Sequence, residues 1–316
     1  MIKKRKIGKS GLEVVPFAFG GNVFGWTADE KTSFNILDAY VGAGFDFIDT
    51  ADVYSAWVPG NKGGESETII GDWLKKTGKR NEVVISTKVG AQVSETHRGL
   101  KKDYILREVE DSLKRLQTDH IDLYFTHFDD LTTPVGETLE AYAQLIKEGK
   151  VRYIATSNMS PERIRESLKY SEDNNLPSYI CLQPQYNLYD RKGYESTYES
   201  LVKETGLGVV SYYSLASGFL TGKYHSVEDI ASSARKGQLE NYINDRGQAI
   251  LTALSEVAKE YNATQGQVAL AWLLARPSIT APIASVSKVE QLDILKAVEL
   301  DLSNEAVEKL NEASKY

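Results

Sequence analysis

Short apolar segments recur along the chain, and longer segments with helical periodicity lie between them. Most of the apolar segments are hydrophobic over four or five consecutive residues, which is typical of parallel strands covered on both faces. Segments with strand character occur at residues 14–20, 45–51, 82–88, 121–127, 151–158, 178–187, 208–214 and 279–285. Eight strand–helix alternations, with strands about 30–40 residues apart, favour a closed parallel barrel over an open sheet.

Three other features complete the predicted α/β architecture. The first residues predict a small β-hairpin that turns at 9–11, ahead of the first barrel strand. Asn304 is expected to cap a last helix that ends near Leu310. The segment from about 215 to 245 is long, polar and rich in Gly and Ser, as expected of a functional loop. Because no linker or change of composition marks a boundary, we expect residues 1–316 to form one (β/α)8 TIM-barrel domain.

Composition and charge are those of an ordinary globular protein. The chain has 316 residues, 41% of them hydrophobic, and 37 Lys+Arg against 44 Asp+Glu give a formal net charge of −7. This acidic balance argues against a nucleic-acid or membrane-surface partner, and no stretch approaches the roughly 18 apolar residues of a membrane span. Residues 1–10 are basic but lack the apolar region of a signal peptide.

The cysteine and histidine content excludes two further classes of protein. A single cysteine, Cys181, excludes an internal disulfide framework and any multi-cysteine zinc site. The sequence also contains no H-E-x-x-H motif and no close His/Cys spacing, so we expect no metal. Together with the charge pattern, these features predict a soluble cytoplasmic protein.

Candidate chemistry lies where the predicted strands end, because the carboxyl ends of barrel strands carry the working residues. Three neighbouring strands contribute Asp49, Tyr54, Lys88 and His127. An unperturbed phenol has a pKa of about 10, which a neighbouring ammonium lowers. A carboxylate would hold the lysine, and the imidazole could orient a carbonyl or join a proton relay. Such a set is suited to protonating a carbonyl oxygen while its carbon gains a hydride.

Each of these residues also has a purely structural interpretation. Asp49 could cap a helix, Tyr54 is one of 18 tyrosines and could serve packing, and His127 could be a satisfied buried residue. Lys88 is harder to explain in this way, because an unpaired buried ammonium is costly. The four residues together favour a functional site.

The sequence resembles the aldo-keto reductases over about residues 2–310, in particular their bacterial branch and the members similar to channel β subunits. The matching motifs are 44–54 (GFDFIDTADVY), 86–88 (STK), 121–124 (IDLY) ahead of His127, 156–158 (TSN), QPQYN around Gln183, and LASGFLTGKY at 215–224. Each motif is weak alone, but their order on predicted strand ends is specific. The resemblance implies a (β/α)8 barrel that binds an extended nicotinamide cofactor without a Rossmann domain. In agreement, no G-x-G-x-x-G follows any strand.

The resemblance also assigns roles to residues. It implies that Tyr54 is the general acid, that Lys88 lowers its pKa, that Asp49 pairs with Lys88, and that His127 orients the substrate carbonyl. The cofactor-binding residues that it implies are Gly21, Asn22, Ser157, Asn158, Gln183, Tyr212, Leu215, Ser217, Gly218, Lys223, Arg235, Ser285, Ser287, Lys288 and Gln291.

Within this set, the resemblance distributes the parts of the cofactor among groups of residues. It places the carboxamide at Ser157, Asn158 and Gln183, the nicotinamide ring against Tyr212, the pyrophosphate near Lys223 and Arg235, and the adenosine 2′-phosphate at 285–291. Lys288 is the only cation in that last stretch, which favours NADPH, with NADH possible. Two residues depart from the family pattern: Leu295 stands where many relatives have an adenine-contacting Asn, and Ser285 stands where this branch often has Gly.

Trp26, Trp57 and Phe128 follow the first, second and fourth strands and could line an apolar substrate pocket. The leading hypothesis is therefore an NAD(P)H-dependent reductase of aldehydes or ketones. A cofactor-binding, redox-sensing subunit with slow or no turnover is one alternative, since some relatives serve a membrane channel in this way. A barrel hydrolase or aldolase with Lys88 as Schiff-base nucleophile is another. The substrate and the oligomeric state, with a homo-oligomer as one option, stay open.

Overall fold

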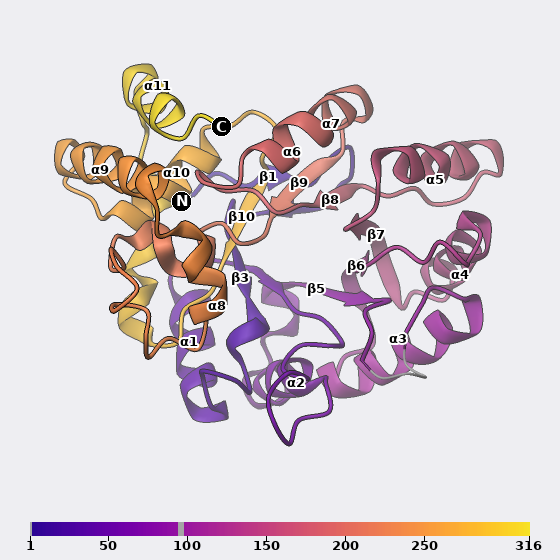
Figure 1. Cartoon of the computed structure of the whole chain (residues 1–316). Coiled ribbons are helices and arrows are strands. Elements are labelled where there is room, and N and C mark those ends of the chain that lie inside the picture. The colour runs from indigo at the N-terminus through magenta and orange to yellow at the C-terminus, as the bar shows by residue number, and fades with distance from the viewer. Residues whose placement is uncertain (1, 94–97) are drawn as a thin grey trace.

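A closed barrel of eight parallel strands lies at the centre of the computed structural model, which describes residues 2–93 and 98–316 (Figure 1). Around the barrel, the strands are β3 (Ala18–Gly20), β4 (Phe47–Asp49), β5 (Val84–Val89), β6 (Ile121–Thr126), β7 (Val151–Ser157), β8 (Cys181–Gln183), β9 (Gly208–Ser211) and β10 (Ala281–Ala284). The ring closes where β10 pairs with β3. Each of the eight apolar segments supplies one of these strands, so the predicted TIM barrel is confirmed.

Helices follow the strands and cover the outside of the barrel (Figure 1). Their bounds are α1 (Glu30–Gly42), α2 (Glu65–Thr77), α3 (Lys102–Leu116), α4 (Val135–Lys147), α5 (Pro161–Asp173), α6 (Lys192–Thr197), α7 (Glu199–Thr205), α8 (Lys236–Leu239), α9 (Asp245–Glu260), α10 (Gln265–Leu274) and α11 (Asn304–Ala313). Helix α3 shows why they form: Ile105, Val109 and Leu116 are buried on one face, while Arg107 and Lys114 are exposed on the other. No helix in the described ranges is long and apolar enough to cross a membrane.

The start of helix α11 differs from the prediction. Its N-cap is Ser303, whose hydroxyl accepts a hydrogen bond from the Ala306 N–H at 3.2 Å. Asn304 is therefore the first helical residue, and its predicted role as the cap is wrong. Ser and Asn are both good caps, and the extended backbone of Ser303 decides between them here. The helix ends at Ala313, beyond the predicted end at Leu310.

The N-terminal hairpin closes the amino end of the barrel. Its strands, β1 (Arg5–Lys6) and β2 (Glu13–Val14), pair antiparallel as predicted. Ile7 and Leu12 are buried in one cluster with Phe47 and other residues that point into the barrel. The turn needs glycine at Gly8, where φ is +57° and an added Cβ would meet the Ile180 carbonyl oxygen at 2.2 Å. The hairpin therefore leaves the carboxyl ends of the strands as the open end of the barrel.

A long segment separates strand β9 from helix α9. It contains the short helices η3 (Ala216–Thr221), α8 and η4 (Glu240–Tyr242), joined by turns. The backbone is left-handed at Ser217 (φ 57°) and Gly218 (φ 94°), which interrupts η3 with a kink. We call residues 215–242 the strap, because its side chains reach other loops at the open end of the barrel.

Candidate active site

Strand ends at the open mouth bring the predicted Asp, Tyr, Lys and His together. The Lys88 Nζ atom donates hydrogen bonds to the Asp49 carboxylate at 2.6 Å and to the Tyr54 hydroxyl at 3.0 Å. The ring of His127 lies 6.1 Å from the ring of Tyr54, centroid to centroid. Lys88 is fully buried and Asp49 is 1% exposed. The four side chains therefore form one site, which was expected from their places in the sequence.

The strand register explains how Asp49 is held. Asp49 on β4 lies opposite Ser86 on β5, and Ser86 and Lys88 are two residues apart and so point to the same side. The Ser86 hydroxyl and the Gln183 amide donate to one oxygen of Asp49, at 2.8 and 3.1 Å, while Lys88 occupies the other. Ser86 was not assigned a role from the sequence, although its spacing from Lys88 was a usable signal. With three donors, Asp49 has little freedom to move.

Burial and charge set the protonation states of the lysine and the tyrosine. Burial opposes the charge of Lys88, but Asp49 and Tyr54 together raise the pKa of Lys88 above its ordinary value, so it stays an ammonium. Burial raises the pKa of Tyr54, and the Lys88 charge lowers it by less. The expectation that Lys88 lowers the pKa of Tyr54 is thus right for the sign of its contribution and wrong for the net shift. The phenol keeps its proton at neutral pH and is available as a donor.

His127 is neutral in this environment. Burial and the nearby charge of Lys88 hold the pKa of His127 well below its usual range. Its Nδ1 atom is buried and has no hydrogen-bond partner in the described part of the chain. The ring stacks on Phe128 with centroids 4.8 Å apart, which fixes its plane. A neutral imidazole carries one N–H and one lone pair, so it can orient a polar atom without adding charge.

The predicted carboxamide-binding residues lie beside this quartet. The Ser157 hydroxyl donates to the Gln183 carbonyl at 2.8 Å, and the Asn158 amide donates to the His127 carbonyl at 2.9 Å. The Tyr212 hydroxyl donates to the Asn158 side-chain oxygen at 3.0 Å. Four residues from three successive strand ends are thus joined to one another and, through Gln183, to the quartet.

The strap contacts both sides of the mouth. The Ser217 hydroxyl donates to the Gln238 side-chain oxygen at 3.0 Å, and the Gln238 amide donates to the Tyr213 hydroxyl at 3.2 Å. On the other side, the Arg235 guanidinium lies over the ring of Trp26, 5.4 Å from its centroid. The strap therefore spans from the end of β9 to the loop after β3.

Three cations near the mouth have no acidic partner. Within the described ranges, Lys223, Arg235 and Lys288 form no ion pair with an Asp or Glu, although Lys223 lies 4.8 Å from the ring of Tyr224. Burial lowers the pKa of Arg235, which is a cost that an anionic partner would offset. Leu215 and Gly218 belong to the same strap, Leu215 packing partly buried against the core. These cations fit a ligand that carries phosphate groups.

Near the pairing of β10 with β3, the segment 285–291 that is predicted to hold the 2′-phosphate adjoins the predicted cofactor-binding residues Gly21 and Asn22. The Ser285 hydroxyl donates to the Asn22 side-chain oxygen at 2.7 Å, and a Cβ added to Gly21 would lie 2.8 Å from the Ser66 hydroxyl. Beyond them, the Gln291 side-chain oxygen accepts from the Ser287 N–H at 2.9 Å. Leu295, the departure from the family pattern, is buried in the core, and this accounts for an apolar residue at that position.

Comparison with known proteins decides the family. Residues 16–315 match the model of the Aldo/keto reductase family. The chain belongs to this family.

Relatives of this aldo/keto reductase carry several kinds of name. It is 37% identical to the uncharacterized oxidoreductase YrpG of Bacillus subtilis (97% of this chain, 94% of the relative) and 34% identical to a probable voltage-gated potassium channel subunit beta of Oryza sativa (97% and 94%). It is also 32% identical to the aldo-keto reductase str7 of Strobilurus tenacellus (98% and 92%). Family membership and two of these names support a reductase function.

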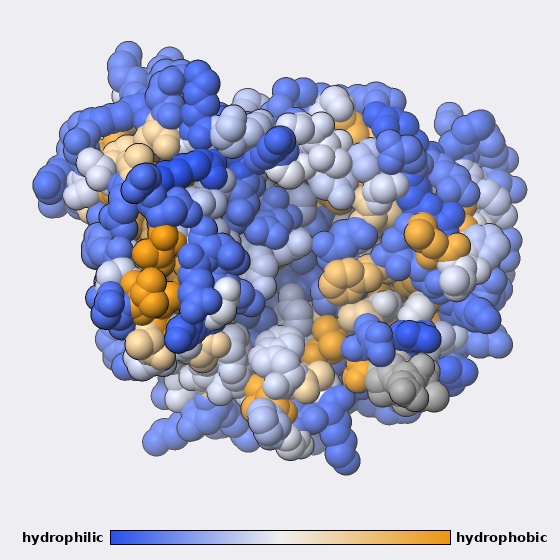
Figure 2. Space-filling view, viewed as in Figure 1, coloured by the Kyte–Doolittle hydropathy of each residue, from blue (hydrophilic) through white to orange (hydrophobic). Residues whose placement is uncertain are grey.

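An aromatic wall flanks the quartet of this aldo/keto reductase. The rings of Trp26 and Trp57 meet edge to face with centroids 5.7 Å apart, and Trp57 lies 6.1 Å from Tyr54. The Asn61 amide donates to the carbonyls of Gly25 and Ser55, both at 3.1 Å, and so ties together the two loops that carry the tryptophans. Figure 2 shows a hollow at the centre of this face with apolar residues along part of its margin.

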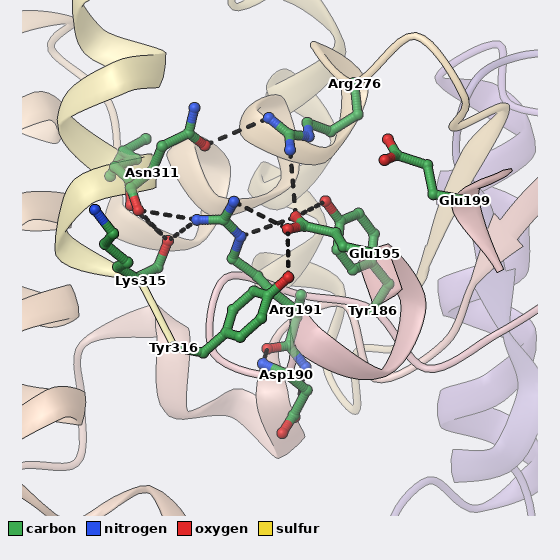
Figure 3. A network of polar contacts seen from close by, with 12 residues as sticks. Tyr186, Asp190, Arg191, Glu195, Glu199, Arg276, Asn311, Lys315 and Tyr316 are labelled. Atoms are coloured by element: carbon green, nitrogen blue, oxygen red, sulfur yellow. Dashed lines mark hydrogen bonds and ion pairs between the residues drawn. The ribbon is translucent and has the colours of Figure 1, made fainter. Parts of the chain in front are cut away.

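A polar network in the aldo/keto reductase joins the start of helix α6 to the ends of helices α10 and α11 (Figure 3). Arg191 forms two hydrogen bonds with Glu195, at 2.9 and 3.1 Å, and donates to the Ser314 hydroxyl at 2.9 Å. In the same loop, the Asn187 amide donates to the Tyr213 carbonyl at 3.0 Å. The loop that Arg191 ties to the end of helix α11 therefore also contacts Tyr213, the residue that the strap contacts.

Proposed function

We propose that this protein is an NADPH-dependent reductase of aldehydes or ketones, with Tyr54 as the proton donor. The observation that carries the proposal is the 3.0 Å contact between the Tyr54 hydroxyl and the Lys88 ammonium, beside a neutral His127. A phenol that keeps its proton until a carbonyl oxygen needs it is a suitable general acid. A buried ammonium stabilises the phenolate that is left behind.

The residues at the mouth fit a nicotinamide dinucleotide. Lys223, Arg235 and Lys288 lack carboxylate partners in the described structure, and phosphate groups would supply the missing negative charge. Lys288 stands alone on the segment where the adenosine 2′-phosphate is expected, which supports NADPH over NADH. When bound, such a cofactor supplies the hydride that the carbonyl carbon receives.

The chain's own side chains then divide the remaining work. Asp49, held by Ser86 and Gln183, keeps Lys88 in place and charged. Lys88 favours loss of the proton from the Tyr54 oxygen, and that proton passes to the carbonyl oxygen of the substrate. His127 orients this oxygen through a neutral ring nitrogen, so the site gains no second positive charge.

The aromatic wall supports an apolar or aromatic substrate body. Trp57 and Phe128 are 48% and 47% exposed, so their faces are open to a ligand at the mouth. Burial of such faces on binding is favourable in proportion to the apolar area covered. The wall therefore supports small carbonyl compounds with an apolar body as the substrate class.

A cofactor-binding, redox-sensing subunit is a second candidate, because one relative is named as a probable potassium channel subunit beta. The complete quartet favours turnover over binding alone. A Schiff-base mechanism is disfavoured, because Asp49 and Tyr54 outweigh burial and keep Lys88 in its non-nucleophilic, charged form.

The proposal is tested by fluorescence titration with NADPH and NADH, followed by steady-state reduction of a panel of aldehydes and ketones. We expect tighter binding of NADPH and sustained turnover of at least one carbonyl compound. A single turnover per subunit followed by silence would instead support the sensing role. Failure of both cofactors to bind would overturn both candidates.

A further inference from the structure

Asp52 is a buried carboxyl group without a partner. Its side chain lies in the loop two residues before Tyr54, the residue is 2% exposed, and neither of its carboxyl oxygens has a hydrogen-bond partner in residues 2–93 and 98–316. Only its backbone is engaged, through a hydrogen bond from its N–H to the Lys88 carbonyl at 3.3 Å. An ionised carboxylate in such a place would be costly, because burial opposes its charge more strongly than the Val53 N–H and the Arg115 guanidinium favour it.

Among the described residues, the cation that acts on the Asp52 carboxyl is Arg115, and it is already paired. Arg115 on α3 donates to Glu67 on α2 and to Glu108 on α3, each at 2.6 Å. Glu67 is fully buried and also accepts from the Thr87 hydroxyl at 2.5 Å. Arg115 therefore balances two carboxylates, and a third negative charge at Asp52 would be left without compensation.

The other titratable groups that act on Asp52 in the described ranges are three buried phenols, of which Tyr142 on α4 is hydrogen-bonded to the Thr126 hydroxyl at 2.9 Å. Tyr104 on α3 and Tyr124 on β6 are buried, and their hydroxyls have no partner among the described residues. Burial raises the pKa of all three phenols, so none of them offers a charge. Around Asp52, helix α2 thus presents a carboxylate. Helix α3 presents a carboxylate, a guanidinium and a phenol, and β6 and α4 each present one phenol. Burial and the two glutamates accordingly hold the pKa of Asp52 well above its usual range, although Arg115 and the Val53 N–H oppose them.

We propose that Asp52 is held as a neutral carboxylic acid, and that its uncharged state keeps the loop of Tyr54 packed against α2 and α3. Asp52 is a positioning residue: it touches no reacting atom and acts through the backbone between β5 and Tyr54. Ionisation would add a third negative charge beside Glu67 and Glu108 and would favour displacement of the loop. The consequence for catalysis rests on the proposed role of Tyr54, whereas the protonation state does not.

The isosteric variant Asp52→Asn tests the protonation state through stability. An unfolded Asp has a pKa of about 3.9, so the raised pKa in the fold gives Asp52 a stabilising contribution that is fully present below that pH. This contribution to the stability of the wild type is lost as the pH rises toward the folded-state pKa. Asn does not ionise, so D52N has no such pH-dependent loss. We expect the melting temperature of D52N relative to wild type to rise between pH 5 and pH 9, by on the order of a few degrees.

Asp111→Asn is the matched control, because Asp111 lies on the same helix pair and is 51% exposed. The difference in melting temperature between D111N and wild type should not grow with pH. The proposal would be overturned if the difference in melting temperature between D52N and wild type stayed constant with pH. It would also be overturned if the wild type became more stable relative to D52N as the pH rises. If D52N does not fold, carbon-13 NMR of aspartate-labelled wild type decides instead. One carboxyl should stay protonated at pH 7, and ionisation of every carboxyl would refute the neutral state.

Activity separates this inference from the proposed function. D52N should extend carbonyl reduction to higher pH than wild type, because the loop no longer acquires a charge. If neither protein reduces any carbonyl compound while the stability difference still grows with pH, the proposed function fails and the neutral acid stands. An unchanged alkaline limit together with a growing stability difference would refute the link to Tyr54.

Discussion

The Lys88 ammonium lies between the Asp49 carboxylate and the Tyr54 hydroxyl, 2.6 Å from the first and 3.0 Å from the second. One buried cation is therefore shared by a group that is already negative and a group that becomes negative when it gives up its proton. Asp49 keeps the lysine charged in the resting site, and Tyr54 gains the benefit only as its proton leaves. This asymmetry is what a proton donor near neutral pH requires.

Replacing Tyr54 by Phe should abolish most turnover. The ring and its edge contact with Trp57 are kept, while the only proposed proton donor is removed. We expect kcat to fall by about 10²–10⁴-fold, the usual contribution of a positioned general acid, with little change in the Kd of NADPH. Steady-state kinetics and fluorescence titration measure the two. Tyr170→Phe on helix α5 is the control, and undiminished reduction by Y54F would refute the acid assignment.

Replacing Lys88 by Met should destabilise the fold. Asp49 would become a buried carboxylate without its cation, and loss of one partner of a buried ion pair typically costs about 3–5 kcal/mol. Urea denaturation measures the change in the free energy of unfolding. The double variant Asp49→Asn with Lys88→Met removes the stranded charge and should recover part of the loss. Equal stability of the single and double variants would contradict this account.

Replacing Lys288 by Met should weaken binding of NADPH and leave binding of NADH unchanged. Hydrogen bonds to charged groups contribute about 1.5–3 kcal/mol, so the Kd of NADPH should rise by roughly 10–100-fold. Lys296→Met is a matched control, because Lys296 lies on the same segment but is paired with Asp293. A parallel loss of affinity for both cofactors would place Lys288 elsewhere than at the 2′-phosphate.

Replacing Trp57 by Ala should raise KM for bulky aromatic aldehydes more than for small aliphatic ones. The indole is held edge to face against Trp26 and offers apolar area only to substrates large enough to reach it. For the aromatic substrate, we expect kcat/KM to fall by a factor that corresponds to a free energy of roughly 1–3 kcal/mol, because the substrate no longer covers the apolar area of the indole. Leu131→Ala, at a position that is 83% exposed, serves as the control. Equal effects on all substrates would argue against a specificity role.

The neutral state of His127 predicts a simple pH profile. Because burial and Lys88 lower its pKa, kcat/KM should show no limb near pH 6.5, where an ordinary histidine titrates. Stability should fall in acid, since the unfolded chain takes up a proton below about pH 6.5 that the folded site resists. His127→Gln should reduce this acid loss, measured by thermal unfolding between pH 7 and pH 5. A limb at pH 6.5 that disappears in H127Q would show that the ring titrates normally.

The barrel and the quartet could be predicted because both follow from local patterns. Continuous apolar segments predict the strands. Residues at the carboxyl end of a strand, such as Lys88 and His127, are then predicted to lie at the same end of the barrel. That the chain forms one domain, that it is cytoplasmic and that the cofactor residues act as assigned all stay predictions.

What the sequence could not supply depends on three-dimensional surroundings. The net pKa shift of Tyr54 is decided by the depth of its burial, which no motif records. The contact of Arg235 with Trp26 depends on the path of a long loop, and the partnerless state of Asp52 depends on how two helices pack around it. The choice of Ser303 over Asn304 as a cap depends on backbone angles at adjacent residues with similar propensities.

The stacking of Arg235 on Trp26 joins a cation of the strap, which we propose holds phosphate groups, to the aromatic wall, which we propose contacts the substrate. Coupling between two binding events is reciprocal. If a bound substrate shifts the Arg235–Trp26 pair and so changes the affinity for the dinucleotide, the dinucleotide changes the affinity for that substrate by the same factor. Under the proposed function, the size of the substrate and the affinity for the dinucleotide should therefore depend on each other through the Arg235 guanidinium.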